Sequence, residues 1–495
     1  MASFPFDNSY ARLPDRFFTR VAPTAVSSPR LIRVNTPLAQ ELGLDPTWLA
    51  SEDGVRVLAG NSVPDNAASI AMAYAGHQFG GFVPQLGDGR AILLGEIVGH
   101  DGVRRDIQLK GPGRTPFSRG GDGRAALGPV LREYVVSEAM HALGIPTTRS
   151  LAAVLTGDRV VREAGMLPGA VLTRVATSHI RVGTFEFFAS RRDTEGVRAL
   201  ADHVIARHYP DAARAEQPYR ALLDAVIRAQ SDLIAKWLHV GFIHGVMNTD
   251  NMSVSGETID YGPCAFLDEY DPGMTFSSID RHGRYAYGRQ PAIGEWNLTQ
   301  LASCLLPVLA ADPETATAMA NEALDAFAPA IQQAYDTGMR RKVGLLVPRA
   351  GDAELVGALL AAMAPNMADF TLTFRGLGEW AGQEGADAER AAVRGLFADG
   401  SAFDVWVTRW TQRLSEEPMD PAVRRAAMLA VNPAFIPRNH RIEAVIRSAT
   451  EQDDFAPFEE LLAVLARPFE AQPEFARYME PPLAHERVRA TFCGT

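Results

Sequence analysis

Three polar residues near the middle of the chain have the chemistry of a nucleotide and metal site. Asp250 and Asn251 are adjacent, and Asp260 follows nine residues after Asn251. Carboxylate and amide oxygens are the ligands that Mg²⁺ takes together with the phosphates of a substrate. A further carboxylate in the same place can accept a proton. These residue types and their spacing therefore predict a reaction on a phosphate-bearing substrate.

The order of these residues follows the layout of a protein-kinase catalytic loop, with one change. A kinase reads His-Arg-Asp, four further residues and then Asn, and the Asp takes the proton of the attacking hydroxyl. When His244 and Asn251 are placed on this pattern, the position of the Asp is Val246, which cannot accept a proton. Asp260 stands where a kinase has the metal-binding Asp of Asp-Phe-Gly. The alternative is an ordinary turn, in which Asp and Asn bond to nearby backbone.

The elements around the loop have the order found in the helical lobe of a kinase. Residues 231–238 predict a helix that ends near Gly241, and residues 242–245 enter a loop. Residues 252–254 and 257–262 read as two short strands, and we expect them to form a hairpin.

A second group of residues could bind phosphate at a hairpin. Gly87 and Gly89 come before a predicted strand at 91–98, and Lys110 ends a predicted strand at 105–110. Glycines let backbone N–H groups approach phosphate oxygens, and a lysine on a strand places a fixed positive charge on them. The full Gly-x-Gly-x-x-Gly pattern is absent, so an ordinary hairpin with a solvated lysine is the alternative.

A lysine in this role needs a carboxylate to orient it, and the predicted helix at 125–143 offers two. Helical spacing places Glu138 among the apolar residues and Glu133 towards one flank, which slightly favours Glu138 as the partner of Lys110. Either glutamate could be the partner, because a buried glutamate without one is costly. The alternative for each is a solvated side chain.

Several arginines add positive charge near the predicted hairpin. Flexible glycines among arginines suit a triphosphate, because guanidinium groups bind phosphate oxygens in pairs. Asp122, inside the glycine-rich loop, could stabilise an arginine or contact the base or ribose. Unrelated surface arginines are the alternative. The arginines of this group are Arg114, Arg119, Arg124, Arg174 and Arg181.

Composition restricts the class of protein. The chain has 495 residues, 47% hydrophobic and 22% charged, which is ordinary for a globular protein. A formal charge of −11 argues against general nucleic-acid binding. The longest apolar run, at 301–311, contains Pro307 and is too short to span a bilayer. The first residues lack the pattern of a secretory signal. Three cysteines do not make a disulfide scaffold. We expect a cytoplasmic protein that does not bind membranes.

The distribution of predicted elements indicates an α+β protein with two lobes. Strands are predicted at 150–155, 160–163 and 170–175, and the chain is mainly helical after Ser190. A β-rich part followed by an α-rich part predicts a nucleotide cleft between lobes. The expected division is an N-terminal extension at 1–80, a kinase-like N-lobe with the nucleotide loop at 81–180, a kinase-like C-lobe with the catalytic and metal site at 181–345, and a C-terminal helical region at 346–495.

Long motifs over nearly the whole chain resemble the selenoprotein O family (SelO, also YdiU) of protein adenylyltransferases, which have a pseudokinase fold. Motifs of this length rarely agree by chance. They are residues 6–10, 74–80, 85–90, 108–111 and 244–251, with Asn432-Pro433 and Arg438-Asn439 near the end.

The resemblance implies transfer of AMP from ATP to Ser, Thr or Tyr hydroxyls of proteins, including the chain itself. It implies that Asp250 is the proton acceptor and that Asn251 and Asp260 hold Mg²⁺ (or Mn²⁺). Family spacing makes Glu133 the partner of Lys110. The residues implied to bind ATP are Gly87, Gly89, Arg90, Lys110, Asp122, Gly123, Arg174, Arg181 and Asp260.

One departure from the family concerns cysteine. Some bacterial members pair a cysteine near the C-terminus with a second one in a redox-sensitive disulfide. Here Cys493 is near the end, but residues 276–278, where its partner is expected, are Phe-Ser-Ser. This difference argues against redox control through that disulfide.

Other reactions remain open from the sequence. UMP transfer from UTP with Mn²⁺ is a variant of the same chemistry. A phosphotransferase that uses Asp250 as an unusual base is a second hypothesis, and Val246 argues against it. A catalytically inactive nucleotide-binding scaffold is a third, and the retention of Lys110, Asn251 and Asp260 argues against it.

Overall fold

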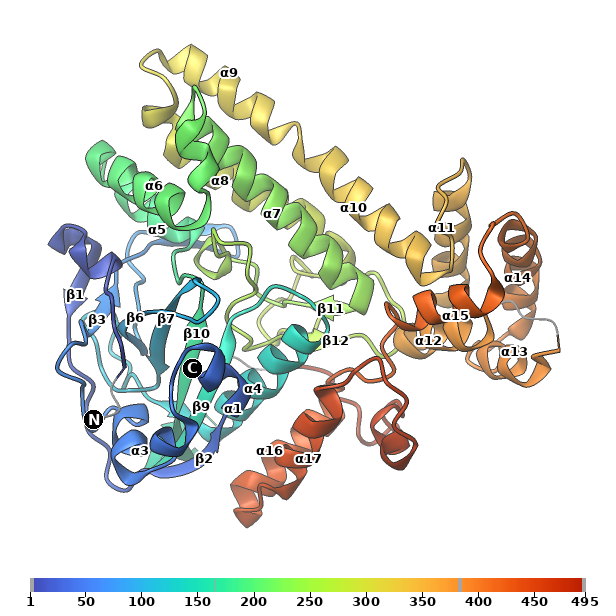
Figure 1. Cartoon of the computed structure of the whole chain (residues 1–495), viewed down its shortest axis with the longest axis horizontal. Coiled ribbons are helices and arrows are strands. Elements are labelled where there is room, and N and C mark those ends of the chain that lie inside the picture. The colour runs from blue at the N-terminus through green and yellow to red at the C-terminus, as the bar shows by residue number, and fades with distance from the viewer. Residues whose placement is uncertain (1–3, 164, 382–384, 492–495) are drawn as a thin grey trace.

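An antiparallel sheet of eight strands forms one side of the molecule in the computed structural model, which describes residues 4–163, 165–381 and 385–491 (Figure 1). The strand order is β1-β3-β6-β7-β10-β9-β2, and β8 pairs with β10. The strands are β1 (Phe18–Arg20), β2 (Arg30–Val34), β3 (Ile70–Met72), β6 (Ala91–Val98), β7 (Arg104–Lys110), β8 (Ala125–Ala126), β9 (Arg149–Arg162) and β10 (Gly165–Ala176). Two further strand pairs are β4 (Gly76–Gln78) with β5 (Gly81–Val83), and β11 (Phe242–Ile243) with β12 (Ala265–Phe266).

Both faces of this sheet are covered, because its strands carry apolar residues on both sides. Leu94 packs with the short helices near the N-terminus, whereas its neighbour Leu93 packs with the long helix α4. Successive side chains of a strand point to opposite faces, so β6 contributes to both cores. The helices that cover the two faces are α1 (Thr36–Glu41), α2 (Pro46–Leu49) and α3 (Glu52–Leu58) on one side, and α4 (Leu127–Ala142), α5 (Val182–Ala189) and α6 (Thr194–His208) on the other.

The second half of the chain is helical, as predicted. Helix α7 ends where the sequence indicates, because Gly241 adopts a left-handed conformation (φ 73°) that closes it. Figure 1 shows α9 and α10 running beside α7 and α8. These helices are α7 (Pro218–Val240), α8 (Gln290–Leu309), α9 (Pro313–Leu324) and α10 (Phe327–Lys342).

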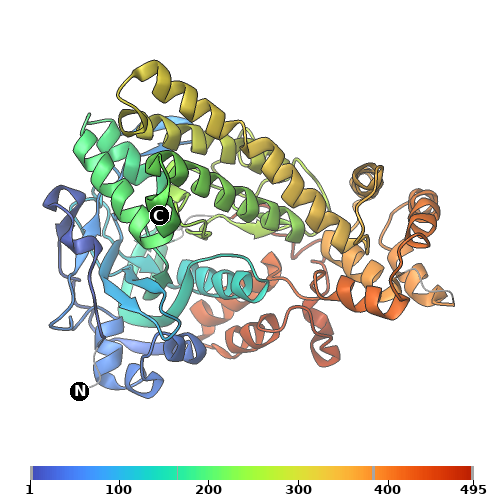
Figure 2. The same ribbon diagram turned by 45° about the horizontal axis from the view of Figure 1, so that its top comes forward.

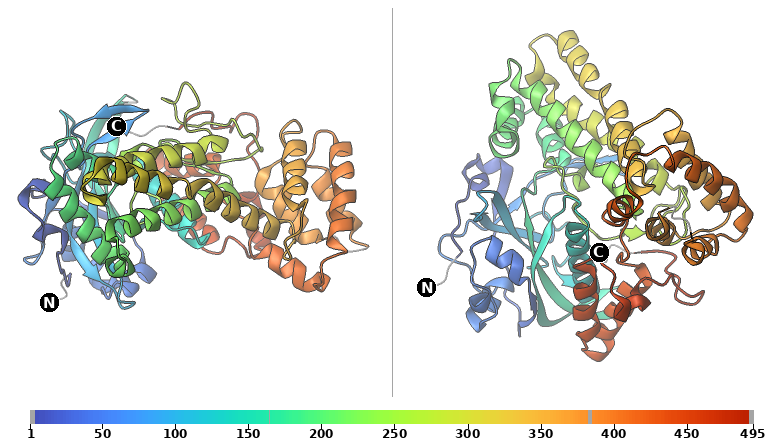
Figure 3. Two further views of the ribbon diagram at one scale, coloured as in Figure 1. Left: turned by 90° about the horizontal axis from the view of Figure 1, so that it is seen from above. Right: turned by 45° about the vertical axis from the view of Figure 1, so that its right-hand side comes forward.

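Seven more helices follow α10. Five of them gather at the end of the molecule farthest from the sheet (Figure 3), and the last two lie beside α4 (Figure 2). They are α11 (Asp352–Met363), α12 (Phe370–Trp380), α13 (Asp387–Arg394), α14 (Gly400–Leu414), α15 (Pro421–Leu429), α16 (Asn439–Gln452) and α17 (Ala456–Leu465). The architecture is therefore mixed α/β, with a sheet lobe and a helical lobe. No helix within the described ranges is long and apolar enough to cross a membrane.

The strand predictions near Lys110 are confirmed, and two others differ from the structure. Strands β6 and β7 form the predicted hairpin. The predicted strands 150–155 and 160–163 are one strand, β9, because Gly157 (φ 78°) lies at an irregularity in the pairing with β10, and the strand continues past it.

The prediction that residues 252–254 and 257–262 form a hairpin is wrong. Each segment pairs with a distant part of the chain instead. Val254 N–H donates to the Ile180 carbonyl at 3.0 Å, and Thr258 N–H donates to the Pro146 carbonyl at 3.0 Å. The backbone groups that the hairpin needs are thus used to fasten this loop to the connections on either side of the long β9–β10 hairpin.

Candidate nucleotide and metal site

A cavity of about 970 Å³ lies where the sheet meets the loop of residues 244–262, and it gathers the predicted site residues. Among the residues predicted for the site, Glu133 does not line this cavity. The predicted residues in its wall are Gly87, Gly89, Arg90, Lys110, Asp122, Gly123, Arg174, Arg181, Asp250, Asn251 and Asp260. We call it the first cavity. A volume of this size suits a ligand as large as a nucleotide.

The register of the sheet brings the central cations to one face. Lys110 lies opposite Leu172, and Arg174 lies opposite Gln108 on the neighbouring strand. Lys110 and Gln108 are two residues apart on β7, so their side chains point to the same face. Arg174 shares that face because it is directly across from Gln108. The sheet therefore presents Lys110 and Arg174 together at the cavity.

Asp260 is the carboxylate around which these cations gather. It accepts hydrogen bonds from Arg174 Nη2 at 2.7 Å and from Arg181 Nη1 at 2.5 Å, and Lys110 Nζ lies 3.8 Å away. Burial acts to raise the pKa of Asp260, but Arg174, Arg181 and Lys110 hold that pKa well below its ordinary value. The carboxylate is thus ionised and can serve a metal as well as the cations.

Glu133 is the partner of Lys110, and the slight preference of helical spacing for Glu138 is wrong. Lys110 Nζ forms an ion pair with Glu133, whose other contact is Arg174, with 2.6 Å between Nη2 and Oε1. Glu138 binds Arg149 Nη2 at 2.7 Å on the other side of α4. Twelve of the sixteen residues of α4 are buried, so an apolar stripe does not distinguish the two flanks of this helix.

Burial also affects Lys110 itself. It lowers the pKa of the Lys110 ammonium, while Glu133 acts in the opposite direction. The pKa of Glu133 is lowered, because Arg174 and Lys110 outweigh the effect of burial. The four groups Lys110, Glu133, Arg174 and Asp260 form one buried network of alternating charge at the back of the cavity.

Asp250 lies in the same cavity but outside this network. Gln78 Nε2 donates to its Oδ2 at 3.1 Å, and its buried Oδ1 has no hydrogen-bond partner among the described residues. Burial raises the pKa of Asp250 to about 6. Oδ1 also lies close to Gly76, where a Cβ atom would come within 2.6 Å of it. Asp250 therefore has one carboxylate oxygen without a partner in the described part of the chain, which is buried against Gly76 in a position that a larger residue at 76 would not permit.

The short hairpin β4–β5 holds the loop of residues 244–251 in place, a role that the sequence did not reveal. His77 N–H donates to Thr249 Oγ1 at 2.7 Å, and Phe79 N–H donates to Asn248 Oδ1 at 3.1 Å. Glu186 lies against both segments, 2.5 Å from His77 Nδ1 through Oε1 and 2.5 Å from Thr249 Oγ1 through Oε2. The only signal in the sequence was the length of the motif at 74–80.

The oxygen donors of Asn251 and Asp260 fit a hard divalent cation. Asn251 Nδ2 donates to the Val246 carbonyl at 3.0 Å, which leaves its amide oxygen as an acceptor. Across the described ranges, no group of three or more His, Cys, Asp or Glu side chains is placed to hold a metal. A metal here would therefore need the phosphates of a nucleotide as further ligands, which is how Mg²⁺ is usually bound.

The glycine-rich loop behaves differently from the buried network. Asp122 stabilises an arginine, as one of its predicted roles required, and that arginine is Arg162, with 2.8 Å between Nη1 and Oδ2. Sequence reasoning missed Arg162 because it comes forty residues later, on β9. Arg124 donates to the carbonyls of Thr24 and Ala25. Arg114 and Arg119 are exposed at the rim, and no described carboxylate pairs with either.

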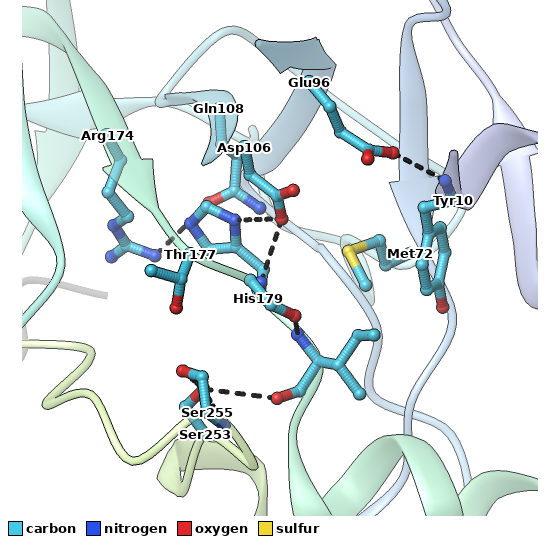
Figure 4. Close-up of polar contacts among 12 residues, drawn as sticks. Tyr10, Met72, Glu96, Asp106, Gln108, Arg174, Thr177, His179, Ser253 and Ser255 are labelled. Carbon is cyan, nitrogen blue, oxygen red and sulfur yellow. Dashed lines mark hydrogen bonds and ion pairs between the residues drawn. The ribbon is translucent and has the colours of Figure 1, made fainter. Parts of the chain in front are cut away.

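A second buried layer supports the sheet behind the cavity (Figure 4). Gln108 accepts a hydrogen bond from Arg174 and donates one to Asp88, which follows Gly87. Burial raises the pKa of Asp88 to about 6. Asp106 accepts hydrogen bonds from His179 N and from His179 Nδ1, each at 2.9 Å. These contacts fix the turn between β10 and Arg181, so the position of Arg181 depends on β7 as well as on its own segment.

Comparison with known proteins identifies the family. The family model described as protein adenylyltransferase SelO matches residues 1–466. The chain belongs to the SelO family. Relatives named protein nucleotidyltransferase YdiU include one from Rhodopseudomonas palustris (strain BisB18), 66% identical over 99% of both chains, and one from Methylorubrum extorquens (strain PA1), 67% identical over the full length of both. A third, from Bradyrhizobium diazoefficiens, is 64% identical over 99% of both chains. Membership makes this chain a nucleotidyltransferase.

Two cysteines of this SelO-family chain, Cys264 and Cys304, are buried within the described ranges. Cys493 lies outside the described residues. The segment at 276–278 nevertheless lies beside the C-terminal end of the described chain, because Ser278 N–H donates to the Thr491 carbonyl at 3.1 Å. Backbone hydrogen bonds therefore hold these two segments together.

Proposed function

We propose that the chain transfers AMP from ATP to Ser, Thr or Tyr hydroxyls of proteins, and that its two lobes form a kinase-like fold. The observation that carries this proposal is the arrangement of charge in the first cavity. Three buried cations, Lys110, Arg174 and Arg181, converge on Asp260, whereas the position of the kinase base is Val246, which is apolar and buried. Asp250 supplies a free carboxylate oxygen instead.

Each residue has a role in this proposal. The cations hold the β- and γ-phosphates and stabilise the charge that develops on them as they leave. Asn251 and Asp260 hold Mg²⁺ (or Mn²⁺), which when bound neutralises phosphate charge. Glu133 orients Lys110. The remaining residues surround the nucleotide: Gly87, Gly89, Arg90, Asp122 and Gly123.

The reaction balances with these groups alone. The acceptor hydroxyl oxygen attacks the α-phosphorus, and the bond between that phosphorus and the oxygen bridging to the β-phosphorus breaks. The hydroxyl proton passes to the Asp250 carboxylate, and pyrophosphate leaves with the bridging electron pair. A general base of this kind contributes about 10²–10⁴-fold to the rate. The raised pKa of Asp250, about 6, suits a base that works near neutral pH.

The position of the label in ATP tests the proposal. The protein is incubated with ATP and Mg²⁺, with label on the α- or the γ-phosphate, and self-modification is measured. Label from the α-position should become covalent, with an intact-mass gain of about 329 Da for AMP, against about 80 Da for phosphate. Lys110→Ala should remove the signal. Label from the γ-position would overturn the proposal in favour of a phosphotransferase.

A further inference from the structure

A second cavity, of about 710 Å³, lies on the helical lobe, and the reaction proposed above does not use it. Its walls are the facing sides of α7 and α10, the turn that follows α4, and the segment around Val431. Its volume is within the range of sites that hold small molecules.

All the charged side chains in the wall of this cavity are positive except one. Four cationic side chains line the cavity, and Asp232 is the one carboxylate among its described lining residues. The four are Arg228, Lys236, Arg341 and Lys342. The chain as a whole carries a formal charge of −11, so a concentration of positive charge in one hollow is not a consequence of its composition.

These cations also lack ionic partners. Within the described parts of the chain, no carboxylate lies within 4 Å of Arg228, Lys236, Arg341 or Lys342, and Asp232 itself forms no salt bridge. Lys236 donates only to the Gly144 carbonyl, at 3.4 Å. By contrast, Arg220, which lies on the same helix α7, forms a salt bridge with Asp224 at 3.1 Å.

Lys342 is the strongest single observation. Only 3% of its surface is exposed, and its ammonium group has no hydrogen bond or ion pair with any described residue. Its nearest recorded contacts are the rings of Phe374 and Phe370, whose centroids lie 4.5 and 5.6 Å from Nζ. Burial lowers the pKa of Lys342 to about 7. A buried cation without a counter-ion is costly, and an anion in the adjoining cavity would relieve that cost.

We propose that the second cavity binds a small polyanion, a molecule with several carboxylate or phosphate groups, through Arg228, Arg341 and Lys342. Guanidinium groups at the mouth suit bidentate contacts with anionic oxygens. Lys342, which is buried in the same wall, adds a positive charge when it is protonated. The occupant touches the turn at Gly144, directly after α4, the helix that carries Glu133.

Binding is tested with two probes, citrate for carboxylate and tripolyphosphate for phosphate, titrated calorimetrically at low salt into metal-free protein. The double variant Arg228→Gln/Arg341→Gln should weaken binding of at least one probe by about tenfold or more, since each charge-assisted contact contributes on that order. Lys342→Met should weaken it as well. A preference for one probe identifies the anionic group.

The matched control is Arg409→Gln/Arg447→Gln, which removes two exposed arginines that line neither cavity. It should leave the affected probe's binding within about twofold, below the energy of one such contact. The proposal fails if neither probe binds saturably below about 1 mM. It also fails if affinity is retained in the Arg228 and Arg341 variant and is lost in an Arg114→Gln/Arg119→Gln variant, because the probe would then occupy the first cavity. The exposed arginines keep the test decisive even if Lys342→Met does not fold.

Discussion

Buried cations line both cavities, but they are paired with carboxylates in the first cavity and have no such partner among the described residues in the second. In the first cavity Lys110 and Arg174 are neutralised by Glu133 and Asp260 in a buried network. In the second, Lys342 is equally buried, yet no described carboxylate pairs with it. Paired charges hold a fixed geometry before substrate arrives, as transition-state stabilisation requires. Unpaired charges favour binding of an anion from solution. We therefore infer that buried cations paired with carboxylates belong to a catalytic site, and that buried cations without such partners belong to a site that only binds.

Removing the free carboxylate oxygen of the first cavity should have the largest effect. We expect Asp250→Asn to reduce turnover by about 10²–10⁴-fold, the range for loss of a general base, while ATP still binds. The measurement is the rate of α-label transfer together with nucleotide affinity. Asp232→Asn, the same change in the wall of the second cavity, is the control and should transfer at the wild-type rate. Near wild-type turnover in Asp250→Asn would assign the base to another group.

Breaking the paired network should be the next largest effect. Glu133→Gln leaves Lys110 and Arg174 with one fewer carboxylate, and loss of one member of a buried ion pair typically costs about 3–5 kcal/mol. We expect a fall of this order in the free energy of unfolding, measured in urea, and loss of label transfer. Glu138→Gln, on the same helix, should keep transfer because Glu138 binds Arg149 instead. If the two variants transferred label at the same rate, the ion pair of Lys110 with Glu133 would not be needed for the reaction.

Those two glutamates also show what the sequence can and cannot predict. Two local signals were reliable: the hairpin β6–β7 and the helix end at Gly241 were predicted from residues next to each other in the chain. Helical spacing failed for Glu133 because α4 is buried on most sides. The choice needed the position of the helix on the sheet, which depends on packing between distant segments.

The same limit applies to the other failures. Residues 252–262 look like a hairpin locally, but their N–H groups bond to segments around residues 146 and 180. Arg162 pairs with Asp122 across forty residues, and no spacing rule connects them. The residue types of the site were predictable because phosphate and metal chemistry requires them. The partners that hold those residues were not, since they are set by the tertiary fold.

A smaller effect should follow from loosening Asp250 without removing it. Gln78→Leu deletes the amide that donates to Asp250 Oδ2 at 3.1 Å. A hydrogen bond to a charged group contributes about 1.5–3 kcal/mol, so kcat should fall by about tenfold to a hundredfold, with KM for ATP little changed. Gln300→Leu, on α8 and away from the first cavity, is the control. A rise in KM with constant kcat would mean that Gln78 contacts the nucleotide and does not position the base.

The prediction that most sharpens the comparison of the cavities is the dependence of stability on pH at Lys342. Burial lowers the pKa of Lys342 from 10.5 to about 7 in the folded chain. Between these two values the unfolded chain holds a proton that the folded chain has lost, so this lysine makes stability rise with pH across that window. Below pH 7 both states are charged, and the full cost of burying the charge remains. Lys342→Met should therefore be more stable than wild type at pH 7, and its advantage should shrink as the pH approaches 10. Urea unfolding at several pH values measures this difference.

Lys236→Met serves as the control, because that exposed side chain stays in water in both states. A variant that is destabilised at pH 7 would mean that Lys342 already has a counter-charge, and the two cavities would then not differ in pairing.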